Sequence, residues 1–392
     1  MISYQASKII SESGIINDAY LIVNDEKIIG IGKEPAKNGE VVCFSNSIIS
    51  PGFIDVHTHG GVGYETGKGS FAELSEWTRF EIKQGVTGFL PSTPSVPLDQ
   101  LKKAAHDVKL AMKEPYTNIL GMHMEGPFFR KGKKIGAQNP EYIIEDLPEE
   151  YMEFIKNNSS IIAYLSLDPQ HNYAETIVSN CNCWGIKVAA AHSEILYNDF
   201  LEKKASYSSI IHTFNGMIGL DHREPGLAYA ACFDDDLYAE IICDGFHVDY
   251  LMLALFFKLK GYQKPVLITD AMLAAGMPPG SAYRLGNIEV TVNEDGKVVK
   301  EDGGLASSTL TLDKAVRNIV QYVGVPLDKA IQMASLNPAK LLGIDDKKGS
   351  IKEGKDADFI VLNSELEVME TYIKGENLYR KTDTDGKYVG KL

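Results

Sequence analysis

The chain has 392 residues, of which 44% are hydrophobic and 23% charged, and its 39 basic and 53 acidic side chains give a formal net charge of −14. This composition excludes a mainly disordered chain, and the negative charge disfavours nucleic acid and anionic membrane surfaces as partners. No apolar run approaches the roughly 18 residues of a spanning helix, and residues 1–14 lack a basic-then-apolar signal pattern. We therefore expect no membrane association and a cytoplasmic location.

The five cysteines form an odd and scattered set. Such a set favours reduced thiols in a cytosolic protein over a disulfide framework. The alternative is a zinc site that uses the C-x-C pair of Cys181 and Cys183. The full set is Cys43, Cys181, Cys183, Cys232 and Cys243.

The two ends of the chain share a β-rich texture. Residues 1–50 contain short strand-like runs whose turns carry Asn, Asp, Gly and Lys, and the same texture returns in residues 346–392. Isolated hairpins are only marginally stable in water. We therefore expect the two ends to pair into one small β-sandwich domain, built from residues 1–50 and 346–392.

Between the ends, apolar strand-like runs alternate with helical stretches. Near-continuous apolar character is typical of strands that are buried on both faces. Eight strand-and-helix units are what a closed barrel requires, so the pattern predicts an α/β fold with a TIM-like (β/α)8 barrel as catalytic domain in residues 51–345. One barrel helix is expected to end at Gly324, and another to start at Asn337-Pro338 and stop at Gly343. The eight runs are residues 48–59, 86–94, 118–126, 161–169, 186–194, 209–217, 237–245 and 265–271.

Polar side chains stand at the C-terminal ends of five of these runs. That end of a barrel is the face on which active sites are built. Imidazole nitrogens and carboxylate oxygens are ligands of catalytic divalent metals. The sequence therefore predicts that six donors converge on one mouth, namely His57, His59, Glu125, His192, His212 and Asp270.

His57 and His59 form a His-x-His pair. Residues two apart in a strand point to the same side, so both imidazoles face one metal ion. The alternative is that a strand end simply holds two hydrogen-bonding histidines. The flanking sequence, PGFIDV before the pair and two glycines after it, favours the metal.

Glu125, His192 and His212 form a second group, each directly after an apolar run. A carboxylate buried there without a partner would cost several kcal/mol, which a cation removes. The alternatives are a salt bridge from Glu125 to Lys131 and core roles for the two histidines. Asp270 is expected to be a metal ligand, a general base or both, with a helix cap as the alternative.

A basic cluster follows the sixth run. The Arg223 guanidinium is suited to bind phosphate or carboxylate, and His222 and His247 are further candidate donors. The alternative for Arg223 is a surface ion pair with Glu224. The basic run of residues 131–134 is expected to be a solvated loop or part of a mobile lid.

The motifs together resemble one family closely. They include PGFIDVHTHGG, GMHMEGPF, AAHSE, HTFNGM followed by REPG, DGFHVD and ITDAMLAAGMPPGSAYRLG. In this order they are similar to the N-acetylglucosamine-6-phosphate deacetylase family of the amidohydrolase superfamily. The resemblance implies a barrel enzyme with one or two divalent metal ions per subunit, usually a homodimer, that removes acetate from an amino sugar phosphate.

The resemblance also assigns roles to residues. Glu125, His192 and His212 match the family's main metal site, Asp270 its catalytic acid and base, and the intact His57 and His59 make a second ion plausible. The substrate side consists of His247, of Asn215 and Gly216 at the sugar phosphate, of Arg223 at the phosphate, and of Gln138, where many members have a histidine. The metal can be Zn, Fe, Mn, Co or Ni, because the ligand types admit all of them.

Three other functions remain open at this point. A deacetylase for the galactosamine epimer differs by the orientation of one hydroxyl, which these motifs do not resolve. A cyclic-amide hydrolase of the same superfamily usually has a carboxylated lysine at the end of the fourth strand, where this chain reads LSLDP. A catalytically dead barrel that serves as a scaffold would have lost ligands, and all six donors are present.

Overall fold

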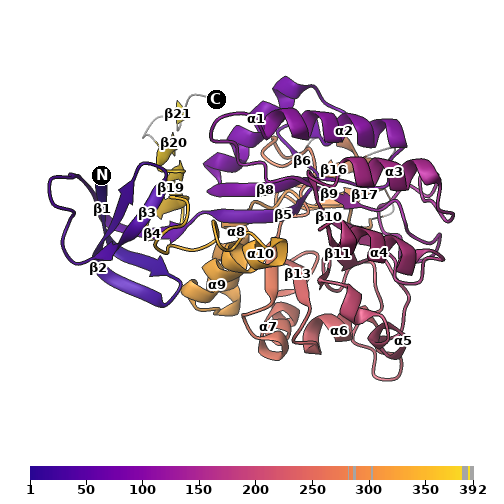
Figure 1. Ribbon diagram of the computed structural model, residues 1–392. Coiled ribbons are helices and arrows are strands. Elements are labelled where there is room, and N and C mark those ends of the chain that lie inside the picture. The colour runs from indigo at the N-terminus through magenta and orange to yellow at the C-terminus, as the bar shows by residue number, and fades with distance from the viewer. Residues whose placement is uncertain (281, 286–287, 302, 382–386, 389–392) are drawn as a thin grey trace.

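Two β-sheets organise the chain (Figure 1). The computed structural model describes residues 1–280, 282–285, 288–301, 303–381 and 387–388. One sheet is a parallel barrel, and the other is formed by the two ends of the chain and lies beside it. Among the described residues, none of the helices combines the length and the apolar character that crossing a membrane requires.

The barrel contains the eight predicted strands, paired in parallel and in chain order. The backbone N–H of Asp270 donates to the carbonyl of His57 at 2.9 Å, which joins the last strand to the first and closes the ring. Nearly all strand residues are buried, which accounts for the continuously apolar runs. The strands are β5 (Phe53–Thr58), β8 (Val86–Thr93), β9 (Met122–Glu125), β10 (Ile162–Leu167), β11 (Lys187–Ala190), β12 (Ser209–Ile210), β13 (Tyr238–Ile242) and β14 (Pro265–Ile268).

Helices cover the outside of the barrel (Figure 1). They are α1 (Phe71–Lys83), α2 (Leu98–Ala111), α3 (Glu149–Asn157), α4 (Ala174–Cys183), α5 (Tyr197–Leu201), α6 (Leu227–Phe233), α7 (Tyr250–Lys260), α8 (Leu312–Asn318), α9 (Leu327–Ala334) and α10 (Leu336–Leu342). A π-helical turn, Ile319–Val323, continues α8 to Gly324, and Gly343 ends α10 in the left-handed conformation, so both predicted stops are confirmed. The predicted start at Asn337 is wrong by two residues. The Asn337 side chain instead donates to the carbonyls of Tyr262 and Pro265, which ties α10 to β14.

The second sheet joins the two ends of the chain. Strand β4 pairs in parallel with β1 and antiparallel with β18, and the order is β21-β20-β19-β18-β4-β1-β2-β3. The sheet curls over a shared core that includes Leu21, Ile28 and Phe359, and the N–H of Ile28 reaches the carbonyl of Lys355 at 3.0 Å. The strands are β1 (Ile2–Ser11), β2 (Gly14–Asn24), β3 (Lys27–Gly32), β4 (Glu40–Pro51), β18 (Phe359–Leu362), β19 (Val368–Ile373), β20 (Glu376–Arg380) and β21 (Lys387–Tyr388).

Two small sheets were not predicted. A three-stranded sheet, β15 (Ala282–Leu285), β16 (Ile288–Val292) and β17 (Val298–Lys300), follows β14, and the hairpin β6 (Gly60–Gly61) and β7 (Tyr64–Glu65) follows β5. The Asp295-Gly296 pair between β16 and β17 is a recognised hairpin signal. Both small sheets lie after strands whose ends carry predicted metal ligands.

Glu81 on α1 is an example of a carboxyl group that the fold buries. Its Oε1 accepts a hydrogen bond from Trp77 Nε1 at 2.8 Å, and burial raises the pKa of Glu81 to about 8. The folded state binds this proton more tightly than the unfolded state. The contribution of Glu81 to the free energy of unfolding therefore falls by about 1.4 kcal/mol per pH unit as the pH rises from 4.5 to 8.

We expect Glu81→Gln, which imitates the protonated acid, to remove the part of the pH dependence of the unfolding free energy that Glu81 causes. The free energy of unfolding of the variant should therefore exceed that of the parent protein at pH 8 and differ little at pH 5. Urea unfolding curves at the two pH values measure the effect. Equal pH dependence in both proteins would show that Glu81 does not titrate in this range.

Candidate metal centre and active site

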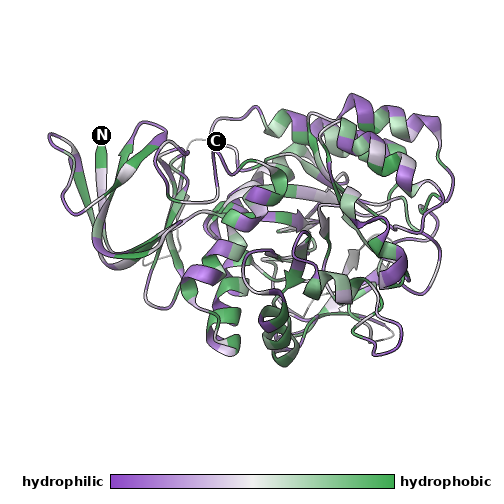
Figure 2. Ribbon diagram, turned by 60° about the horizontal axis from the view of Figure 1, so that its bottom comes forward, coloured by the Kyte–Doolittle hydropathy of each residue, from purple (hydrophilic) through white to green (hydrophobic). Residues whose placement is uncertain are grey.

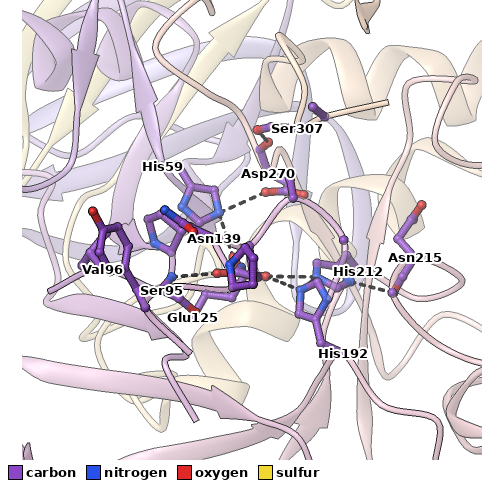
Figure 3. A pocket seen from close by; sticks show the side chains of 18 of the residues that line it. His59, Ser95, Val96, Glu125, Asn139, His192, His212, Asn215, Asp270 and Ser307 are labelled. Atoms are coloured by element: carbon purple, nitrogen blue, oxygen red, sulfur yellow. Dashed lines mark hydrogen bonds and ion pairs between the residues drawn. The ribbon is translucent and has the colours of Figure 1, made fainter. Parts of the chain in front are cut away.

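The six predicted donors meet at the C-terminal mouth of the barrel and form two clusters. Figure 3 shows five of them, namely His59, Glu125, His192, His212 and Asp270. One cluster consists of His57, His59 and Asp270, and the other of Glu125, His192 and His212. Within each cluster the ligand atoms all lie within 4.8 Å of one another. The structure therefore brings together residues from five strand ends that are far apart in the sequence.

The first cluster shows the geometry expected of a His-x-His pair. The Nε2 atoms of His57 and His59 lie 3.2 Å apart. Oδ1 of Asp270 lies 3.2 Å from Nε2 of His59 and 3.7 Å from Nε2 of His57. Three donor atoms from two adjacent barrel strands, β5 and β14, thus face one point.

Glu125 contacts both clusters. Its Oε1 lies 2.8 Å from Nε2 of His192 and 3.1 Å from Nε2 of His212. Its Oε2 lies 3.2 Å from Nε2 of His59. The alternative of a salt bridge to Lys131 is wrong, because Lys131 lies 3.9 Å from Glu145 on a neighbouring loop. One carboxylate therefore faces histidines of both clusters.

The backbone at three donors is strained. His192, His212 and Asp270 have positive φ values of 44°, 29° and 47°. Such a conformation costs a residue with a side chain about 1–3 kcal/mol, and it persists where the surrounding structure requires it. Each of the three residues lies two positions after the last residue of its strand, so the left-handed turn aims each side chain at the mouth.

The charges in the site depend on one another. Burial alone would raise the pKa of Glu125, but hydrogen bonds from His192 and His212 hold the pKa well below its usual range. Burial also raises the pKa of Asp270, but His59 and His57 outweigh burial, and the pKa of Asp270 is lowered. Burial lowers the pKa of His59, yet Asp270 and Glu125 raise it to about 9. Both carboxylates are thus ionised at neutral pH.

The donor set fits a divalent cation. The ring nitrogens of His57 and His59, and likewise those of His192 and His212, face each other at 3.2 Å. In each ring Nδ1 has a partner of its own, so Nε2 is the nitrogen that is left for a ligand. Facing nitrogen lone pairs repel unless a proton or a cation lies between them. Imidazole and carboxylate ligands match Zn, Fe, Mn, Co or Ni.

A cavity of about 570 Å³ opens onto the two clusters. A volume of this size is in the range of small-molecule sites. The cavity is lined by four of the five predicted substrate residues, Gln138, Asn215, Gly216 and His247, together with His59, Glu125, His192, His212 and Asp270. The structure thus brings most of the predicted substrate residues beside the predicted metal ligands.

His247 and Gln138 are held by neighbours. Nδ1 of His247 lies 2.7 Å from Oδ2 of Asp244, and this contact outweighs burial and raises the pKa of His247. Oε1 of Gln138 accepts the backbone N–H of Ser95 at 2.7 Å. Nε2 of His247 and the amide nitrogen of Gln138 are therefore the groups that remain for a ligand.

Gly216 lies too close to His192 to carry a side chain. Its φ is +62°, and a Cβ on this residue would lie 2.6 Å from Nδ1 of His192. The space beside His192 therefore requires glycine in this chain.

Arg223 is the predicted substrate residue that the structure does not bring to the cavity, and the neighbouring candidate donor His222 is exposed as well. Arg223 is exposed in the loop between β12 and α6, where its backbone N–H donates to Oδ1 of Asp221. Among the cavity-lining residues that the structure describes, the single Lys or Arg is Lys68, whose Nζ lies 2.6 Å from Oε1 of Glu65.

Sequence reasoning missed several residues of the site. Lys68, Ser95, Asn139 and Ser307 line the cavity from loops, which carry no pattern that predicts their position. Glu240 on β13 contacts His57 at 2.9 Å. Glu125 was identified as an acid directly after an apolar run, whereas Glu240 lies inside such a run, YAEIICDG, where an acid is also costly without a partner.

The structure does not support the C-x-C zinc site. Cys181 is buried in α4 and Cys183 is exposed, and none of the metal-type clusters found in the described residues contains a cysteine. Burial raises the pKa of Cys181 to about 12, so its thiol is not ionised at neutral pH.

The sequence is similar to known deacetylases. Residues 287–378 match the amidohydrolase family. The N-acetylgalactosamine-6-phosphate deacetylase of Escherichia coli O157:H7 is 33% identical, over 95% of this chain and 98% of that protein. The N-acetylglucosamine-6-phosphate deacetylase of Bacillus subtilis (strain 168) is 31% identical, over 96% of this chain and 97% of that protein.

Solved structures agree with this similarity. The crystal structure of N-acetylglucosamine-6-phosphate deacetylase from Pasteurella multocida superimposes with a TM-score of 0.90 at 29% identity, covering 96% of this chain and 99% of that one. The enzyme from Mycobacterium smegmatis, solved as a mutant in complex with N-acetyl-D-glucosamine-6-phosphate, has a TM-score of 0.88 at 25% identity, covering 96% and 98%.

Proposed function

Because the chain belongs to the N-acetylglucosamine-6-phosphate deacetylase family of the amidohydrolases, we propose that it hydrolyses N-acetyl-D-glucosamine 6-phosphate to D-glucosamine 6-phosphate and acetate. The reaction would serve amino sugar catabolism or recycling. The observation that carries the proposal is Glu125, whose two oxygens face two histidine-containing clusters at the floor of a cavity of suitable size.

One or two divalent cations would be held by the two clusters. Glu125, His192 and His212 form the main site, and His57, His59 and Asp270, with the second oxygen of Glu125, form the other. A bound divalent cation would polarise the acetamide carbonyl and would lower the pKa of a bound water molecule toward 7.

Asp270 is proposed as the acid and base. Its carboxylate is ionised at neutral pH and lines the cavity, so it is free to accept a proton from the attacking water. The same group then returns the proton to the sugar nitrogen, which leaves as an amine. Without this proton, the amide nitrogen is a poor leaving group.

The substrate is proposed to lie between the remaining cavity residues. His247, held by Asp244, donates from Nε2 to the carbonyl oxygen as negative charge develops there. Asn215, Gly216 and Gln138 contact the sugar phosphate. Arg223 binds the phosphate, a contact that requires its loop or a second copy of the chain to approach the cavity.

A second candidate substrate is the galactosamine epimer. The E. coli relative named for that epimer is 33% identical, compared with 31% for the B. subtilis enzyme named for the glucosamine compound. The two identities are nearly equal, so both epimers, which differ in the orientation of one hydroxyl, are candidate substrates.

We also propose that the protein is a cytoplasmic homodimer, as expected from the family. Helix α7 supports the dimer, because residues 250–257 of this helix are apolar (Figure 2) and Leu251 is 81% exposed. Leu255, one turn further on, and the nearby Tyr322 are exposed as well. An apolar surface of this kind is typical of a protein interface.

Arg223→Met is expected to raise KM for the sugar phosphate by about 10- to 100-fold, because a charge-assisted contact to phosphate is lost. KM for unphosphorylated N-acetylglucosamine should not change. Steady-state kinetics on both sugars measure the effect, and Lys68→Met is the comparison variant. A phosphate-specific loss in the lysine variant alone would assign the phosphate to Lys68 instead.

A comparison of sugars tests the proposed function. Acetate release is measured from the 6-phosphates of N-acetylglucosamine and N-acetylgalactosamine, with unphosphorylated N-acetylglucosamine as control. We expect the glucosamine phosphate to have the highest kcat/KM. Preference for the epimer would change the substrate and leave the reaction intact, whereas release from neither phosphate would refute the proposal.

A further inference from the structure

The four histidines of the metal centre differ in what holds their Nδ1 atoms. In three of them the partner is a backbone carbonyl: Ser92 for His59, Lys134 for His192 and Asn215 for His212, at 2.8–3.1 Å. His57 alone has a carboxylate partner, Oε2 of Glu240, at 2.9 Å.

Glu240 lies inside the barrel, below the mouth. It is on β13 and is 0% exposed. A buried carboxylate costs several kcal/mol unless it is paired and hydrogen-bonded. The contact between Oε2 of Glu240 and Nδ1 of His57 offsets this cost.

We infer that Glu240 is a positioning residue that gives the cluster of His57, His59 and Asp270 its own affinity for a divalent cation. By accepting the Nδ1–H of His57, Glu240 fixes the tautomer in which Nε2 is free to bind the cation, and its charge makes the imidazole a stronger ligand. The inference rests on the metal dependence in the proposed function.

The effect should be limited to one cluster. Glu240 contacts His57, whereas His192 and His212 are oriented by the backbone carbonyls of Lys134 and Asn215. Loss of Glu240 therefore leaves the cluster of Glu125, His192 and His212 intact. Equal weakening of both clusters would indicate a general structural role.

The test measures cation binding directly. Metal-free full-length protein is titrated with Co²⁺, and bound metal is counted by equilibrium dialysis and followed by visible absorption. We expect two equivalents for the parent protein. In Glu240→Gln the affinity for one equivalent should fall about 10- to 100-fold, with a changed absorption spectrum, while the other equivalent binds as before.

Two further variants separate charge from orientation. Glu240→Gln still accepts the Nδ1–H and loses only the charge, whereas Glu240→Leu loses both and should weaken the same equivalent further. Glu81→Gln is the matched control, because it converts another buried acid to an amide outside the metal centre, and its Co²⁺ binding should equal that of the parent protein.

A double-variant cycle tests whether Glu240 acts through His57. In a His57→Asn background, the change Glu240→Gln should cause no further loss of Co²⁺ affinity. The inference is overturned if Glu240→Gln binds two equivalents with parental affinity, if both equivalents weaken equally, if the effects of the two substitutions add, or if the parent protein binds only one equivalent. If the parent protein released no acetate, but Glu240→Gln still weakened the binding of one Co²⁺ equivalent selectively, the proposed function alone would be overturned.

Discussion

Asp270→Asn is expected to reduce kcat for acetate release by about 10³-fold or more, because an amide can neither accept nor return the proton that the reaction moves. Oδ1 of Asp270 faces His59 at 3.2 Å, and an amide oxygen there keeps much of the shape of the site. The cluster of Glu125, His192 and His212 does not include Asp270, so its metal should remain bound. Steady-state kinetics and metal analysis on the same protein sample measure both effects.

Asp313→Asn is a matched control for this substitution. Asp313 is also a buried acid, but it pairs with Arg317 on α8, 2.7 Å away, and does not line the cavity. Its kcat should equal that of the parent protein. If Asp270→Asn kept more than a tenth of the parental kcat, the proposed acid and base role would be wrong.

Glu125→Gln is expected to have the broadest effect on metal binding. The substitution removes the charge that both clusters share and leaves His192 and His212 without an anionic partner. We expect the variant to bind less than a tenth of the parental metal and to lose acetate release. Added Zn²⁺ raises the Tm of a protein that binds it in the folded state, so the parent should gain stability on Zn²⁺ addition and the variant should not.

Differential scanning calorimetry with and without Zn²⁺ distinguishes loss of binding from loss of folding. A variant that folds and shows no Zn²⁺ shift supports the bridging role of Glu125. An unchanged Zn²⁺ shift in Glu125→Gln would contradict it.

The barrel was predictable because its strands are buried on both faces. Runs such as residues 161–169 and 186–194 are apolar without alternation, and eight such runs at regular spacing are typical of a closed parallel barrel. The metal ligands were predictable for a related reason. A charged or polar residue such as Glu125 directly after such a run is costly unless it has a function at the strand end.

The walls of the cavity were not predictable in the same way. Lys68 and Ser307 lie on loops, and their distance from the strand ends depends on how the small sheets β6–β7 and β15–β17 fold back. Arg223 shows the opposite error, because it was predicted to lie at the site and does not. Its position in the chain after the sixth strand suggested the mouth, but the loop carries it to the surface.

The acids that contact the histidines of the site from behind, Glu240 and Asp244, were missed for a different reason. Glu240 and His57 are 183 positions apart, and only the closed barrel brings β13 close enough to β5 for the contact. Asp244 and His247 are three positions apart, so their pairing is local and can be read from DGFHVD once the turn is known.

The measurement that tests the account most directly is acetate release from N-acetylglucosamine 6-phosphate by metal-analysed protein, before chelation, after chelation and after return of a divalent cation. The account predicts one acetate per sugar phosphate consumed, loss of the activity on chelation and its recovery with the cation. Protein with a full complement of metal that releases no acetate from this substrate would contradict the account.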